Sequence, residues 1–183
     1  MNAVIYMTEI AEKYVNKNME HMYGEKLLEE ALKREYGLNL KYEPRAQSEH
    51  GKPFLSLQPG IHYNLSHSGK YVVCVLAPQE VGIDVQFHKP NVKFESVLRK
   101  IVPAEDVEKI MGQEDYIKAF YTQWVLREAY IKWTGEGFSK DLRSIDLNNG
   151  KHQLFEIDPD YSCAVWSMSD LKIRMEKVEI NLL

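Results

Sequence analysis

One stretch decides the fold: Trp124-Val125-Leu126-Arg127-Glu128-Ala129-Tyr130-Ile131-Lys132-Trp133-Thr134-Gly135-Glu136-Gly137. We predict that it closes a helix beginning near Tyr116, because apolar residues recur along one helical face. Those residues are Ile117, Phe120, Tyr121, Trp124 and Ile131. The helix should stop at Gly135 and Gly137, since glycine commonly follows the last turn of a helix.

Glu128 falls on the same apolar face, between Trp124 and Ile131. Burying an unpaired carboxylate is costly, so Glu128 needs a cation or a metal ion as its partner. Lys132 lies one turn further along that face. The simpler interpretation is a Glu–Lys pair at i,i+4, which contributes little stability. A functional interpretation requires another partner elsewhere in the chain.

The composition is that of an ordinary soluble globular protein. The chain has 183 residues, 44% hydrophobic and 27% charged, with a net charge of −4. This charge gives no global basic field, so we expect no binding of nucleic acid. Cys74 and Cys163 lie in apolar, strand-like runs, which indicates buried thiols rather than a disulfide. We expect a cytoplasmic protein, because no signal peptide or membrane span is evident.

The order of elements indicates an α+β fold with two halves, residues 1–89 and 90–183. The boundary is placed at Lys89-Pro90-Asn91. In the first half we expect helices over 10–22 and 24–36, an extended segment over 39–43 and a hairpin over 71–87. In the second half we expect helices over 93–101 and from Pro103, before the central helix. Strands should follow over 143–148, 152–157, 161–168 and 172–181, with a hairpin turn at Asn148-Asn149-Gly150.

The strand predicted over 81–87 carries an unusual polar face. Its apolar residues alternate with Gly82, Asp84 and Gln86. Aspartate is disfavoured in strands, and the neighbouring glycine indicates close approach of a ligand or a backbone. The equally weighted alternative is an edge strand with a solvated polar face. Together with Glu128, these side chains offer only oxygen ligands, which suits Mg²⁺.

Four segments in this chain resemble motifs of one enzyme family. They are Gly51-Lys52-Pro53, Asn64-Leu65-Ser66-His67-Ser68-Gly69, Val81-Gly82-Ile83-Asp84-Val85 and Trp124-x-x-Arg127-Glu128-Ala129-Tyr130-x-Lys132. Their order and content are similar to those of 4′-phosphopantetheinyl transferases of the surfactin-synthetase-activating type, over about residues 20–150. Any one of these short motifs alone would be a weak signal, but the combination is specific.

The resemblance implies both a fold and a reaction. The fold would have two similar α+β halves related by a pseudo-twofold axis, with antiparallel sheets and a cleft between them. The enzyme would transfer the phosphopantetheine arm of coenzyme A to a serine of an apo acyl or peptidyl carrier protein and release adenosine 3′,5′-bisphosphate. It would use Mg²⁺, with Mn²⁺ as the alternative ion. Fatty-acid, polyketide and nonribosomal-peptide carriers all fit, and we expect a monomer.

The resemblance also assigns residues by position. Asp84 and Glu128 match metal-binding acids, and Lys132 matches a lysine that contacts the pyrophosphate. Glu128 is also our candidate for the base that takes the serine proton. The positions that line the coenzyme A site are matched by Lys52, Pro53, Ser66 and His67, with Asp84 and Lys132 beside them. Glu105, at a predicted helix start, is a further candidate metal ligand.

Two positions depart from the family pattern. Gln86 stands where many relatives have glutamate, so as a metal ligand it would offer a neutral oxygen. Arg127 stands where lysine is common. The basic residues that hold the 3′-phosphate of coenzyme A have no clear counterpart, and the candidates are Lys17, His21, Lys26 and Arg45.

Simpler interpretations stand beside the functional ones. Lys52 would otherwise be a solvated surface charge and His67 a hydrogen-bonded loop residue. Gln86 also motivates an alternative function, a catalytically weakened relative that binds coenzyme A or a carrier protein as a scaffold. A third hypothesis is a metal-dependent phosphohydrolase that acts on a nucleotide.

Overall fold

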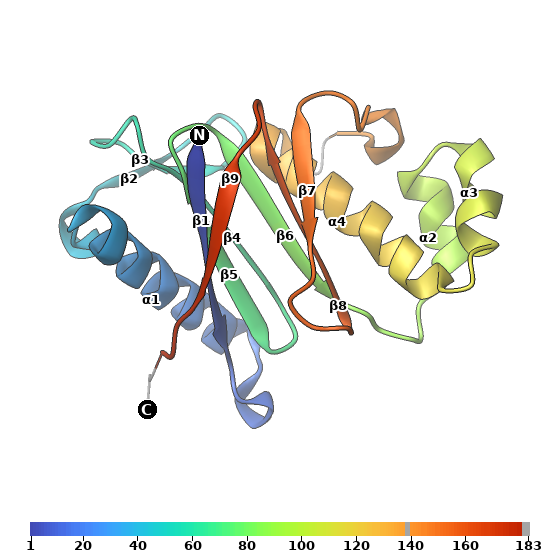
Figure 1. Cartoon of the computed structure of the whole chain (residues 1–183), viewed down its shortest axis with the longest axis horizontal. Coiled ribbons are helices and arrows are strands. Elements are labelled where there is room, and N and C mark those ends of the chain that lie inside the picture. Colours follow the sequence, from blue (N-terminus) through green and yellow to red (C-terminus); the bar gives the residue numbers. More distant parts are fainter. Residues whose placement is uncertain (138–139, 181–183) are drawn as a thin grey trace.

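Two β-sheets stack face to face between two long helices (Figure 1). The computed structural model describes residues 1–137 and 140–180. The first sheet has the order β4 (His62–Ser68), β5 (Tyr71–Ala77), β1 (Asn2–Glu9) and β9 (Lys172–Lys177), and α1 (Lys17–Tyr36) covers its outer face. The second has the order β6 (Val81–Phe87), β8 (Tyr161–Ser167) and β7 (Lys151–Phe155), and α4 (Tyr116–Thr134) covers its outer face. This confirms the predicted α+β class.

The described strands pair antiparallel with one exception. β1 pairs antiparallel with β5 but parallel with β9, so the end of the chain joins the sheet of its beginning. The hairpin predicted over 71–87 is wrong, because β5 and β6 lie in different sheets. Residues 78–80 carry the chain from one sheet to the other. The apolar faces of β5 and β6 then pack against each other in the core between the sheets, where Val73, Val75, Ile83 and Val85 are buried.

Three other local predictions need correction. α1 is one continuous helix from Lys17, and before it only Glu12–Tyr14 forms a 3₁₀ turn (η1). The segment 39–43 is not extended, because Leu40–Tyr42 forms a 3₁₀ turn (η2). The strand predicted over 143–148 is also wrong, because Leu142–Ser144 forms a 3₁₀ turn (η4). The side chains of Asn39 and Asp141 accept backbone hydrogen bonds two residues ahead, which favours a turn over a strand.

α4 has two differently packed ends. Its first half packs on α2 (Phe94–Ile101) and α3 (Ala104–Met111) through apolar residues that include Phe94, Leu98 and Phe120. Its second half packs on β8 through Ala129 and Trp133, against Trp166. The helix ends at Gly135, which has a φ of 73°. The predicted helix and its stop are therefore confirmed. A small hairpin of β2 (Arg45–Gln47) and β3 (Pro53–Leu55) lies outside the two main sheets.

Side chains, rather than a backbone ladder, connect the facing edges of the two sheets. Three polar side chains of β4 accept hydrogen bonds from backbone N–H groups of β6, and we call this row the β4–β6 seam. The pairs are Asn64 Oδ1 with Ile83 N at 2.9 Å, Ser66 Oγ with Val85 N at 3.2 Å and Ser68 Oγ with Phe87 N at 3.0 Å. The seam places Ser66 directly beside the polar face of β6.

Both cysteines are buried free thiols, as the sequence predicts. Within residues 1–137 and 140–180, no helix has the length and apolar character needed to cross a membrane.

Candidate active site

The close approach predicted at Gly82 is made by the backbone of α4. A Cβ atom at Gly82 would lie 2.2 Å from the carbonyl oxygen of Ala129 and 2.3 Å from the backbone nitrogen of Trp133. No side chain fits there, so the helix can rest directly on the strand. This contact brings the polar face of β6 next to Glu128 and Lys132.

Asp84 and Lys132 form an ion pair in the resulting crevice. Lys132 Nζ lies 2.7 Å from Asp84 Oδ1 and 2.9 Å from Ser66 Oγ. The Ser66 hydroxyl donates a further hydrogen bond of 2.8 Å to the same Asp84 oxygen. Asp84 is only 2% exposed, whereas the side chain of Lys132 is 27% exposed and reaches the solvent. The other oxygen, Asp84 Oδ2, is buried and has no hydrogen-bond partner among the described residues.

Glu128 is the second buried carboxylate. It is 6% exposed, and Oε1 has no hydrogen-bond partner within the described part of the chain. Burial, and after it the negative charge of Asp84, raises the pKa of Glu128 to about 7, while Lys132 acts in the opposite direction. The simpler interpretation from the sequence is an i,i+4 pair of Glu128 and Lys132. It is wrong, because Lys132 donates to Asp84 and Ser66 instead.

The two carboxylates fit a divalent cation. Asp84 Oδ2 and Glu128 Oε1 are both buried oxygens that lack a donor, and their side chains repel each other. Leaving such groups unsatisfied is costly, so a cation that both can contact would remove a real penalty. No cluster of three or more His, Cys, Asp or Glu occurs in the parts of the chain that the structure describes. An ion held by these two oxygens would have to take its remaining ligands from water and substrate phosphates.

A cavity of about 220 Å³ opens beside these side chains. The loop over 50–53 forms one wall, and Glu128, Ile131 and Lys132 of α4 form another. Asn64 and the glycines that follow α4 complete the lining. Pro53 therefore lies at the cavity, together with Glu128 and Lys132, as the sequence motifs suggest for a ligand site.

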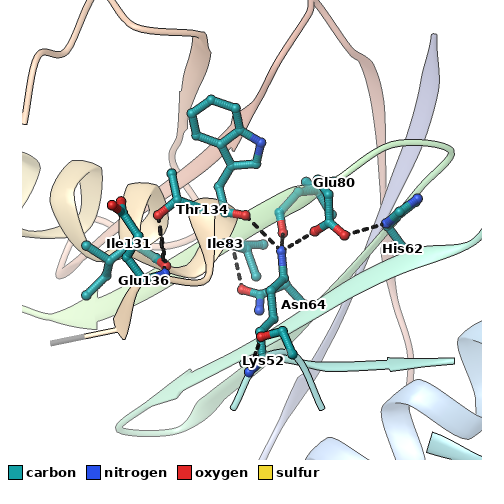
Figure 2. A network of polar contacts seen from close by, with 11 residues as sticks. Lys52, His62, Asn64, Glu80, Ile83, Ile131, Thr134 and Glu136 are labelled. Atoms are coloured by element: carbon teal, nitrogen blue, oxygen red, sulfur yellow. Dashed lines mark hydrogen bonds and ion pairs between the residues drawn. The ribbon is translucent and has the colours of Figure 1, made fainter. Parts of the chain in front are cut away.

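Lys52 lines the same cavity, but its ammonium group is engaged elsewhere (Figure 2). It donates to the carbonyl oxygens of Trp133 at 3.0 Å and Val81 at 3.1 Å, and it pairs with Glu80. Glu80 also lies 2.9 Å from Nδ1 of His62. Lys52 thus ties the loop over 50–53 to the end of α4 and to the first residue of β6.

His67 and Glu105 have surroundings that differ from those of the paired carboxylates. Successive residues of a strand point to opposite faces, so His67 points away from the side of Ser66. Its Nδ1 atom lies 3.4 Å from Oε2 of Glu20 on α1, and its side chain is about half exposed. Glu105 is exposed in the first turn of α3, which packs against the other half of α4.

Gln86 follows Asp84 on the polar face of β6 and is partly buried. Its side-chain oxygen accepts a hydrogen bond of 3.3 Å from Ser68 Oγ, at the next position of the seam. To ligate a metal, that oxygen would have to share or exchange this donor.

Arg127, the other departure from the family pattern, holds the chain beyond α4. It is 3% exposed and donates to the carbonyl oxygen of Leu142 at 3.2 Å and to the side-chain oxygen of Gln123 at 2.6 Å. Burial lowers the pKa of its guanidinium to about 10. The planar, multiple donor geometry of arginine suits this bridging position.

Sequence reasoning missed the roles of Asn64, Glu80 and Ser68. The alternation of polar residues in Asn64-Leu65-Ser66-His67-Ser68 could have indicated the seam, because every second side chain shares one face of a strand. No local pattern marks Glu80 as the partner of Lys52, since the two meet only in the folded chain.

The α+β sandwich and the carboxylate pair beside a lysine fit the class of enzymes that transfer a phosphate-containing group. The comparisons with known proteins then place the chain within that class. A family model described as the 4′-phosphopantetheinyl transferase superfamily matches residues 80–180. The chain belongs to this superfamily, which confirms the resemblance seen in its motifs, and it is a 4′-phosphopantetheinyl transferase by class.

Individual relatives agree with the family assignment. A 4′-phosphopantetheinyl transferase of Bacillus subtilis is 31% identical over 160 residues, which cover 83% of this chain and 69% of the relative. The 4′-phosphopantetheinyl transferase Sfp of Bacillus subtilis (strain 168) is 28% identical over 176 residues, covering 86% of this chain and 78% of the relative. A putative 4′-phosphopantetheinyl transferase of Haemophilus influenzae is 35% identical over 111 residues, which cover 58% of this chain and 44% of the relative.

Proposed function

We propose that this enzyme transfers the 4′-phosphopantetheine arm of coenzyme A to a serine of an apo acyl or peptidyl carrier protein, with Mg²⁺. One observation carries the proposal: Asp84 and Glu128 each present a buried oxygen that has no partner among the described residues, beside Lys132, and Glu128 and Lys132 line the cavity. This arrangement supports binding of a divalent ion together with a pyrophosphate. The family assignment supports coenzyme A as the substrate.

The reaction needs positioning and charge neutralisation more than covalent catalysis. The serine oxygen would form a bond to the phosphorus next to the pantetheine arm. The bond from that phosphorus to the bridging oxygen would break, and its electron pair would leave with adenosine 3′,5′-bisphosphate. A Mg²⁺ ion held by Asp84 and Glu128 would neutralise charge on the pyrophosphate.

The chain's own residues have distinct roles in this proposal. Lys132, which is partly exposed, would donate to the phosphate oxygens as they gain charge. Glu128 would accept the serine proton on a carboxylate oxygen that the ion does not use. Pro53 would border the bound substrate, as would Lys52 if it exchanged Glu80 for a phosphate. Gln86 stays a candidate ligand, and we leave the exposed Glu105 out of the metal site.

The test is transfer to an apo carrier, followed by intact mass. With coenzyme A and Mg²⁺, the carrier should gain the mass of one phosphopantetheine, and EDTA should prevent it. Asp84→Ala and Glu128→Gln should each lower the rate about a hundredfold or more, because each removes a metal contact. Glu108→Gln is the matched control, since Glu108 is an exposed glutamate on α3. Wild-type rates in both site variants would refute the assignment of the site.

The same assay should include fatty-acid-type, polyketide-type and peptidyl carriers, because all present a serine to the enzyme. We propose that a single chain suffices, with residues 1–89 and 90–183 each supplying part of the site. Light scattering during turnover should then show a monomer.

A second candidate function rests on Gln86, which leaves the carboxylate pair without a third acid. In that case the protein would bind coenzyme A or a carrier as a scaffold. Calorimetry would show coenzyme A binding, yet no concentration of Mg²⁺ or Mn²⁺ would give a modified carrier. A phosphohydrolase, in contrast, would release nucleotide products from coenzyme A in the absence of any carrier.

A further inference from the structure

We propose that Ser66 is a positioning residue, whose hydroxyl holds Asp84 and Lys132 in the one orientation that leaves Asp84 Oδ2 free for a divalent ion. This role differs from the contact with coenzyme A that the resemblance of the motif implies. The proposal rests on the proposed function, because it concerns the same metal and phosphate site.

The hydroxyl of Ser66 has no capacity left for a ligand. A serine hydroxyl offers one donor and two acceptor positions. Ser66 donates to Asp84 Oδ1 at 2.8 Å, and it accepts from Lys132 Nζ at 2.9 Å and from Val85 N at 3.2 Å. All three positions are therefore used, and the residue is only 5% exposed. A bound phosphate could reach this hydroxyl only by displacing one of the three partners.

These hydrogen bonds make the two oxygens of Asp84 unequal. Oδ1 accepts from both Ser66 and Lys132, whereas Oδ2 is buried without a partner. Two donors on one oxygen fix the rotation of the carboxylate, as hydrogen bonds to metal-ligating side chains commonly do. Ser66 also holds the ammonium group of Lys132 on the Oδ1 side. The unpartnered Oδ2 is thereby left, together with Glu128 Oε1, for the ion.

The β4–β6 seam supplies a matched control at its next position. Ser68 makes the same kind of contact as Ser66, since its hydroxyl accepts from the backbone N–H of Phe87 at 3.0 Å. Its own proton goes to Gln86 at 3.3 Å instead of to Asp84. Ser66→Ala and Ser68→Ala therefore each break one seam contact, but only Ser66→Ala removes a hydrogen bond from the Asp84–Lys132 pair.

The first experiment measures ion binding directly. Mn²⁺ is titrated into wild-type enzyme, Ser66→Ala and Ser68→Ala in the presence of saturating coenzyme A, and free Mn²⁺ is followed by electron paramagnetic resonance. We expect Ser66→Ala to weaken Mn²⁺ binding about tenfold, the usual scale for losing a hydrogen bond to a metal ligand. Ser68→Ala should stay within about threefold of the wild type, because it leaves every hydrogen bond of Asp84 and Lys132 in place and frees, apart from the N–H of Phe87, only the neutral oxygen of Gln86.

The second experiment separates kcat from KM in the transfer reaction. Ser66→Ala should lower kcat about tenfold and raise the concentration of Mg²⁺ that gives half the maximal rate, while KM for coenzyme A changes less than about threefold. Ser66→Cys serves as a second variant, because it keeps an atom at the γ position and provides only a weak hydrogen-bond donor. Circular dichroism confirms the fold of each variant before it is assayed.

Two results would overturn the inference alone. One is a wild-type affinity for Mn²⁺ in both Ser66 variants. The other is a raised KM for coenzyme A with kcat and Mn²⁺ binding unchanged, which would assign Ser66 to substrate contact. If the wild-type enzyme itself neither binds Mn²⁺ nor modifies a carrier, the proposed function fails, and this inference fails with it.

Discussion

Two lysine–carboxylate pairs have their lysines, Lys52 and Lys132, in the lining of the cavity, and they differ in how completely their polar groups are satisfied. Lys52 pairs with Glu80 and also donates to the carbonyl oxygens of Trp133 and Val81. Its partner Glu80 is in turn close to His62. Lys132 pairs with Asp84, but Asp84 Oδ2 stays without a donor in the described structure.

The difference separates a structural cluster from a reactive one. A network whose members are all satisfied rigidifies the fold, whereas an unsatisfied buried polar group raises the energy of the site until a ligand binds to it. The pair at Lys52 holds the loop over 50–53 against α4. Beside the pair at Lys132, two buried carboxylate oxygens have no partner in the described structure, and these are the oxygens that we propose for an ion. The following predictions test this contrast, from the largest expected effect to the smallest.

Replacing Lys132 should affect the reaction most. Lys132→Met removes the partly exposed cation beside the carboxylates, so we expect kcat to fall about 10³-fold through lost stabilisation of charge in the transition state. The measurement is the steady-state rate of carrier modification at saturating coenzyme A. Lys118→Met, an exposed lysine on the same helix, is the matched control. A Lys132 variant that keeps more than a tenth of the wild-type rate would show that Lys132 does not belong to a reactive cluster.

The buried carboxylate should make the metal-free protein less stable as the pH rises. The pKa of Glu128 is raised from about 4.5 to about 7, so the folded chain retains a proton that the unfolded chain releases. Stability should therefore fall between pH 4.5 and 7 and then level off. Position 128 does not titrate in Glu128→Gln. The free energy of unfolding of this variant, relative to that of the wild type, should therefore rise by on the order of 3 kcal/mol between pH 4 and pH 8.

This difference in the free energy of unfolding is measured by urea unfolding in EDTA at pH 4 and at pH 8. Titrating groups that do not interact with Glu128 cancel in the difference between variant and wild type. A difference that stays constant with pH would show that Glu128 titrates normally, and the strained carboxylate pair would then not exist in solution.

Replacing Lys52 should affect mainly stability. Lys52→Met leaves two backbone carbonyls and Glu80 without their donor, which should lower the free energy of unfolding by about 1–3 kcal/mol. Urea unfolding of this variant and of Lys41→Met, an exposed lysine, provides the measurement and its control. A large rise in KM for coenzyme A with unchanged stability would instead assign Lys52 to the substrate, as the motif resemblance implies.

Restoring the third acid should give the smallest change. Gln86→Glu adds a carboxylate to the polar face of β6. Position 86 follows Asp84 by two residues and lies on the same face of the strand. We expect tighter binding of Mn²⁺ by about tenfold, because affinity rises with the charge of the ligands. Titration in the presence of coenzyme A measures it, with Gln79→Glu, a glutamine on the turn between the sheets, as the control. Unchanged affinity would place position 86 outside the metal site.

Several features of the site could be predicted from the sequence because their signals are local. The apolar stripe that carries Glu128, and the glycine that ends the helix, follow from helical periodicity. The alternation along 81–87 places Gly82 and Asp84 on one face, and the glycine correctly indicates close approach of another backbone. The motifs identify the family, which the comparisons confirm.

Other features depend on contacts between distant segments. The apolar runs 71–77 and 81–87 are equally compatible with a hairpin and with two stacked sheets, because both arrangements bury them. The structure stacks them, and so the polar side chains of β4 meet the edge of β6. Nothing local in Lys52 indicates its bonds to Trp133 and Val81.

The sequence by itself determined the residue types of the site, the helix that carries Glu128 and Lys132, and the family. Only the tertiary structure decided which partner each charge takes. Lys132 donates a hydrogen bond to Asp84 on a strand rather than to Glu128, its neighbour on the helix. The reason is physical. Spacing along a helix or strand sets only the face on which a side chain lies. The packing of α4 on Gly82 and the seam at Ser66 determine which carboxylate oxygens stay without a partner among the described residues.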